Sequence, residues 1–233
     1  MILSIIGQSS HTENAMLAAN VAAARVKSGN KVLLIETDMH MSLFLWNLRR
    51  KHGKVKFPVL ALVCGGLNAA LQEYGAPYHD IVINAGTMPF SAARPALISS
   101  AVAVFPLPLS HLESDGQRLQ ANFADTAKLF NPLVQTRIFV SACGDQIPVQ
   151  KYAAAVSLAA RFPRGSVVAA PGLDFSAMRR AFERGMTVFD DETVDAATVR
   201  ETLRVAKQLY NGPGAEQSPA VRATELEMML GAS

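Results

Sequence analysis

Lys31-Val32-Leu33-Leu34-Ile35 is continuously apolar after its first residue, and Ile81-Val82-Ile83 repeats this pattern further along the chain. Unbroken apolar runs are typical of strands that are covered on both faces, as in a parallel sheet. Longer segments with helical spacing separate such runs, and this alternation indicates right-handed βαβ units. The sequence therefore predicts an α/β fold with a doubly wound, mostly parallel sheet flanked by helices.

The predicted elements alternate along most of the chain. Strands are expected at residues 2–6, 31–36, 58–63, 80–85, 101–106, 136–141 and 166–170. Helices are expected at residues 12–28, 42–50, 66–75, 91–98, 111–129, 149–161, 174–184 and 193–210. Residues 1–210 are thus predicted to form one α/β domain. Glycine and proline in the stretch 211–219 predict a flexible linker, so residues 211–233 are read as a linker and a short tail helix.

Composition narrows the class of protein. Half of the 233 residues are hydrophobic, which is enough for a large core. No apolar run reaches the roughly 18–20 residues of a membrane-spanning helix, so membrane insertion is not expected. The apolar start lacks a basic region and predicts a strand rather than a signal peptide. Cys64 and Cys143 form neither a disulfide framework nor a zinc pattern, and a cytoplasmic protein is expected.

An ordered set of short motifs runs along the chain. It consists of Gln8 ahead of a loop, Asn20-Val21-Ala22 in the next helix, residues 29–38 in the second strand, Met41-Ser42-Leu43 with Trp46 after it, residues 78–84 in a later strand, and residues 180–189 in a late helix and turn. In this order the motifs resemble the ParA/MinD family of partition and positioning ATPases, over about residues 2–210. The resemblance implies a P-loop fold and a nucleotide loop at the first helix.

The chain departs from this family where the family binds and hydrolyses ATP. The resemblance aligns the family loop K-G-G-x-G-K-T with a vestigial nucleotide loop in this chain. That site comprises Gln8, Ser9, Ser10, His11, Thr12, Glu13, Asn14 and Ala15, together with Glu36, Asp38 and Asn84. Ser9 stands for the lysine that crosses the family dimer, Asn14 for the phosphate lysine, and Ala15 for the magnesium-binding hydroxyl.

The other departures remove glycines and carboxylates. Ser10, His11 and Glu13 replace the three glycines of the loop, Glu36 replaces the first aspartate of the second motif, and Asn84 replaces the Walker B aspartate. Asp38 is kept.

These replacements predict that binding of ATP and magnesium is lost and that no catalytic residue remains. Each lost charge-assisted bond to phosphate costs about 1.5–3 kcal/mol. Glu13 adds repulsion, since two like charges about 4 Å apart repel by roughly 4 kcal/mol at an effective dielectric of about 20. Ser10 and Glu13 have the spacing of a capping box, in which each side chain bonds the backbone N–H of the other. In one interpretation, the Glu13 carboxylate occupies the helix start where the family binds phosphate. In the other, Ser10 and Glu13 only cap the helix.

The loop contains side chains of two other chemistries. Asp38 can join His11 and His40 as metal ligands, but no sequential metal-ligand spacing supports this, so loop histidines and no metal are predicted. Ser9 or Ser10 beside His11 can suggest nucleophilic catalysis, but the Gly-x-Ser-x-Gly turn is missing.

A basic stripe is formed by Arg200, Arg204 and Lys207 at helical spacing. ParA-like proteins bind DNA through basic residues of their C-terminal part, so the stripe is a candidate surface for non-specific DNA. Acidic neighbours such as Glu201 favour an ordinary solvated face instead.

The resemblance and its departures together predict a non-catalytic scaffold, localisation or partition factor. It would act through protein partners in plasmid partition, conjugation, or the positioning of a secretion or pilus machine, with a homodimer and recruitment to the nucleoid or cell pole as options. A working ATPase with an unorthodox loop and a non-specific DNA-binding module are the alternatives.

Overall fold

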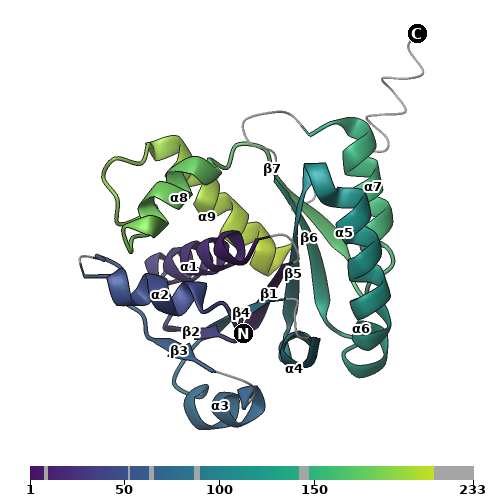
Figure 1. Ribbon diagram of the computed structural model, residues 1–233, viewed down its shortest axis with the longest axis horizontal. Coiled ribbons are helices and arrows are strands. Elements are labelled where there is room, and N and C mark those ends of the chain that lie inside the picture. Colours follow the sequence, from purple (N-terminus) through teal and green to yellow (C-terminus); the bar gives the residue numbers. More distant parts are fainter. Residues whose placement is uncertain (8–9, 52, 63–65, 87–89, 142–146, 213–233) are drawn as a thin grey trace.

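The structure is a computed structural model that describes residues 1–7, 10–51, 53–62, 66–86, 90–141 and 147–212 (Figure 1). Several residues singled out above lie outside the described residues: Gln8, Ser9, Cys64, Cys143 and the tail 213–233.

A seven-stranded sheet forms the centre of the described chain, with the order β3-β2-β4-β1-β5-β6-β7 and every pairing parallel. The strands are β1 (Ile2–Gly7), β2 (Val32–Glu36), β3 (Val59–Ala61), β4 (Asp80–Gly86), β5 (Val102–Pro108), β6 (Gln135–Ser141) and β7 (Ser166–Ala170). This confirms the predicted doubly wound parallel sheet, and all the predicted strands are present with ends shifted by two residues at most.

Helices cover both faces of the sheet (Figure 1). One face carries α1 (His11–Lys27), α2 (Ser42–Arg49), α8 (Phe175–Glu183) and α9 (Ala196–Asn211). The other carries α3 (Leu67–Tyr74), α4 (Phe90–Ser99), α5 (Leu112–Leu119), α6 (Asp125–Phe130) and α7 (Val149–Ala159). The core accordingly has two layers. In β2, Leu34 packs into the layer of α1, and its neighbour Leu33 packs into the opposite layer.

The predicted helix 111–129 is interrupted. A 3₁₀ turn (Leu109–His111) precedes α5, and a π-helical turn (Gln120–Ala124) joins α5 to α6. The prediction was correct about the position of this segment and wrong about its regularity. None of the described helices combines the length and apolar character needed to cross a membrane.

Buried polar contacts fasten the segment after α8 onto α1 and α2. Asn20 of α1 accepts a hydrogen bond from the Val188 N–H at 3.0 Å through its side-chain oxygen. Its amide nitrogen donates to the Met16 carbonyl at 2.8 Å. Trp46 of α2 donates through its indole nitrogen to the Met186 carbonyl at 3.2 Å. The motif at residues 180–189 is therefore in direct contact with two of the other motifs that carry the family resemblance.

Candidate functional site

The candidate site lies at the carboxyl ends of β1, β4 and β2, which are neighbours in the sheet. Gly7 at the end of β1 is in register with Gly86 at the end of β4, and Glu36 at the end of β2 is in register with Asn84. Ligands of parallel α/β sheets bind at this edge, because the loops and helix starts that follow the strands converge there. The sheet order thus brings the predicted residues of three separate loops to one place.

The first helix begins as predicted but pairs its carboxylate differently. Ser10 is the N-cap of α1, and its Oγ accepts a hydrogen bond from the Glu13 N–H at 3.2 Å. This confirms the first half of the capping box. The Glu13 carboxylate accepts from the guanidinium of Arg179 on α8 at 2.7 Å, and its reach back to the Ser10 N–H stays a prediction. A charged donor gives a stronger bond than the backbone N–H of Ser10.

This pair changes the charge balance of the site. Glu13 and Arg179 are 166 positions apart, and both side chains are partly exposed. Glu13 therefore has a cation as neighbour, which the sequence of the loop alone did not provide. The Glu13 carboxylate and its counter-ion Arg179 therefore lie at the start of α1. A phosphate bound at a helix start would need free backbone N–H groups and positive charge there, and this pair is neutral as a whole.

Asn14 fills the space beside the end of β1. Its side chain is buried, and a β-carbon added to Gly7 would lie 1.9 Å from Asn14 Oδ1. Ala15, which follows, is completely buried in the core. Thr12 is half-buried in the first turn of α1. Among the described residues, Asn14 Nδ2 has no hydrogen-bond partner. The position that the resemblance assigns to the phosphate lysine is therefore taken by a short amide packed against the strand.

Glu36 is fully buried, and both of its oxygens are occupied. Oε2 accepts from the Leu43 N–H at 2.8 Å, while Oε1 accepts from the Asp38 N–H at 3.1 Å and from Asn84 Nδ2 at 2.8 Å. Burial raises the pKa of Glu36 to about 7, and the charge of Asp38 adds to this rise, although the three donors oppose it.

The position of Leu43 explains this arrangement. The N-cap residue of α2, Met41, has a left-handed backbone with φ 55° and makes no side-chain cap. The Glu36 carboxylate instead accepts a hydrogen bond from the Leu43 N–H in the first turn of α2. Glu36 therefore holds the start of α2 onto the end of β2.

Asp38 and two histidines meet above the strand ends. The Nδ1 atom of His11 lies 2.6 Å from Asp38 Oδ2, and the rings of His11 and His40 are 3.7 Å apart at their centroids. Asp38 Oδ1 accepts from the His40 N–H at 2.9 Å. One potential ligand atom from each of the three residues lies within 4.8 Å of the others. The sequence raised this grouping only as an alternative to ordinary loop histidines, and the fold brings His11 beside Asp38 from a different loop 27 positions away.

Comparison with solved structures places this site within a known architecture. The cell division ATPase MinD of Pyrococcus furiosus superposes with a TM-score of 0.63 at 15% identity, over 90% of this chain and 98% of that one. A chain of the MinC:MinD cell division protein complex of Aquifex aeolicus gives 0.61 at 13% identity, over 90% and 96%. The cobyrinic acid a,c-diamide synthase of Mycobacterium smegmatis, with a bound ATP analogue and magnesium, gives 0.64 at 14% identity, over 92% and 95%.

The chain has the MinD fold. At these identities the likeness concerns the fold, which is the one that the motif resemblance implied. No family model and no curated protein sequence matches the chain.

On this MinD fold, the predicted basic stripe lies on α9 and is only partly free. Arg200 and Lys207 are exposed. Arg204 is engaged by Glu201, with Nη2 to Oε1 at 2.6 Å, and it also donates to the Ala169 carbonyl at 3.0 Å. The acidic neighbour therefore binds the central arginine of the stripe, and DNA binding stays a prediction.

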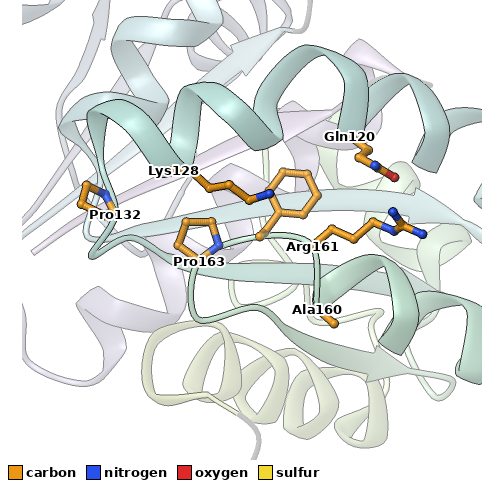
Figure 2. Close-up of a pocket in the computed structure, with 7 residues that line it drawn as sticks. Gln120, Lys128, Pro132, Ala160, Arg161 and Pro163 are labelled. Carbon is orange, nitrogen blue, oxygen red and sulfur yellow. The ribbon is translucent and has the colours of Figure 1, made fainter.

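A surface cavity of about 400 Å³ lies elsewhere on the MinD fold, between the α5–α6 segment and the turn after α7 (Figure 2). It is lined by Gln120, Lys128, Pro132, Ala160, Arg161, Phe162 and Pro163. None of the predicted site residues contributes to it.

Proposed function

We propose that this chain is a non-catalytic protein of the MinD fold that acts through protein contacts, as a scaffold or localisation factor, and that it does not bind ATP and magnesium. The packing of Asn14 against Gly7 carries the proposal, since a side chain of the protein itself fills the space beside the strand end.

The remaining contacts support the same conclusion. The M. smegmatis synthase holds an ATP analogue with magnesium. In this chain Glu13 and Arg179 neutralise each other at the helix start, and the Glu36 oxygens are engaged by backbone and amide donors. Catalysis of phosphoryl transfer depends on cations that stabilise the transferring group, and the loop between Ser10 and Ala15 contains neither lysine nor arginine.

Contacts with other proteins are the mode of action that we propose. MinD of A. aeolicus was solved as a complex with MinC. In this chain Leu129, Phe130 and Leu133 expose 75, 66 and 67% of their surface within five residues of one another. Plasmid partition, conjugation, and placement of a secretion or pilus machine are the settings that this function would serve, with recruitment to the nucleoid or cell pole.

Calorimetric titration with ATP and magnesium tests the proposal, with P. furiosus MinD as the positive control for the conditions. We expect no saturable heat at millimolar nucleotide. Phosphate release should equal that of a Glu36→Ala variant. Saturable heat together with release above that variant would instead support an ATPase with an unorthodox loop.

A further inference from the structure

We propose that His11, Asp38 and His40 form a binding site for a divalent transition-metal ion of the zinc class. The site goes beyond the proposed function, because neither its ligands nor its test involves a nucleotide. Each of the three residues offers one ligand atom, and these atoms lie within 4.8 Å of one another.

The chemistry of the ligands selects the ion. Two imidazoles and one carboxylate are ligands of zinc and of neighbouring divalent transition metals. Magnesium prefers oxygen ligands and keeps several of its waters. The set therefore favours zinc over the magnesium ion that accompanies ATP in the M. smegmatis synthase.

The charge of Asp38 supplies a second, independent argument. Its side chain is fully buried. In the part of the chain that the structure describes, no lysine or arginine pairs with it, and the His11 ring is its one ion-pair partner. A buried carboxylate is costly unless a cation or strong donors compensate it. A metal ion at this position would provide that compensation.

Two of the three ligands are largely positioned before any ion arrives. Asp38 is fixed through Oδ1 by the His40 N–H at 2.9 Å, which leaves Oδ2 directed toward His11 Nδ1 at 2.6 Å. His11 is the first residue of α1, and the rigid helix sets its position. Ligands on a shared zinc ion are somewhat further apart than this nitrogen and oxygen, so binding requires the His11 ring to move outward by less than about 1 Å.

The site is open on its outer side. The His11 side chain is 35% exposed and His40 is exposed, so an ion can enter from solvent. Three protein ligands on a tetrahedral ion leave one position for water, which is the pattern of open zinc sites. The bound ion would join the start of α1 to the loop between β2 and α2.

The test is a zinc titration of the full, tag-free chain after treatment with a chelator, followed by calorimetry. We expect one zinc ion per chain, a higher melting temperature with zinc, and visible absorption bands when cobalt(II) replaces zinc. His40→Gln and His11→Gln should each weaken zinc binding at least about tenfold, as loss of groups at metal sites generally does. Because His40 is exposed, its replacement should leave the fold intact, and circular dichroism verifies this.

His111→Gln is the matched control. His111 is also exposed but lies outside the cluster, so the variant should bind zinc like the original chain. The proposal is overturned if the original chain takes up no zinc at one equivalent, or if His40→Gln and His111→Gln bind zinc equally well. Neither outcome bears on nucleotide binding, so the proposed function is tested separately.

Discussion

The side chain of Asn14 lies so close to Gly7 that a β-carbon at position 7 would be 1.9 Å from its Oδ1, 2.0 Å from its Nδ2 and 2.1 Å from its Cγ. Asn14 is 2% exposed, so the amide cannot move into solvent without disturbing the start of α1. The contact joins the last residue of β1 to the first turn of α1. Position 7 therefore requires glycine, because any larger residue would collide with the side chain of Asn14.

Gly7→Ala should therefore destabilise the protein by about 1–3 kcal/mol, the usual cost of overpacking. Asn14→Ala alone should cost less, because Asn14 Nδ2 has no partner among the described residues. The double variant should recover most of the loss from Gly7→Ala, since the new methyl group then has room. Urea unfolding of all four proteins measures this coupling. A double variant whose loss equals the sum of the two single losses would contradict the contact.

Gly165→Ala provides the comparison. There a β-carbon would meet the backbone oxygen of Ala159 at 1.8 Å, and truncating a side chain cannot relieve a backbone clash. Asn14→Ala should leave the cost of Gly165→Ala unchanged.

Asn20→Ala should lower the free energy of unfolding by about 1–3 kcal/mol, because it leaves the buried Val188 N–H without its acceptor. Asn211→Ala is the matched control: Asn211 is exposed at the end of α9, and its replacement should change stability by less than about 0.5 kcal/mol. Equal effects of the two changes would show that the Asn20 contact does not hold the segment after α8 in place.

The sequence predicted the sheet and named the residues of the site, but it did not give the contacts among them. Leu33 and Leu34 are both apolar because β2 is covered on two faces, and that local pattern predicts a parallel strand directly. The pairing of Glu13 with Arg179 depends on how α8 packs beside α1, which no local pattern encodes. For His11 and Asp38 the sequence raised a shared site as an alternative, but their contact depends on the sheet order, in which β1 and β2 flank β4.

The stability of the protein in acid should depend on Asp190. Its carboxylate accepts from the Val55 N–H at 2.9 Å, the Thr187 N–H at 2.9 Å and Arg50 Nη1 at 2.9 Å. Burial by itself raises the pKa of Asp190, but these donors and the Arg50 charge outweigh burial and leave the pKa below its ordinary value of 3.8. A pKa that is lower in the folded than in the unfolded chain adds stability above the unfolded value, and this stability is lost as the pH falls through the folded value.

Asp190→Asn should therefore cost about 3 kcal/mol at pH about 7, as removal of one partner of a buried pair does, and clearly less in acid below the ordinary pKa of aspartate. Urea unfolding at the two pH values measures the difference. Glu192→Gln breaks the exposed pair with Lys54 and should leave stability unchanged at both. If Asp190→Asn costs as much in acid as at neutral pH, the carboxylate charge is not the stabilising feature.

The last prediction is that the chain associates with itself without nucleotide, through the face that carries His11, Asp38 and His40, with Ser9 assigned to the same face by the resemblance. Large apolar side chains are exposed in the same loop and in the helix that follows it: Met39 by 68%, and Leu45 and Leu48 of α2 by 47% and 61%. In a twofold dimer the same patch of each copy contacts the other copy, and this is the commonest symmetry of soluble dimers. With no triphosphate to accommodate, the two faces can meet directly.

Light scattering over a concentration series, with and without a chelator, measures this association. His40→Glu should weaken the dimer, because it places a carboxylate from each copy in the contact, and Ser9→Arg should do so through two like positive charges. Gln72→Glu makes the same type of change on the exposed side of α3, near the amino ends of the strands, and should leave the dimer intact. A monomer mass up to about 100 μM, equivalent to an association weaker than about 5.5 kcal/mol, would refute the prediction. A dimer that tolerates His40→Glu and Ser9→Arg as well as Gln72→Glu would place the interface on another face, and the exposed leucines and phenylalanine of residues 129–133 would then be the next surface to change.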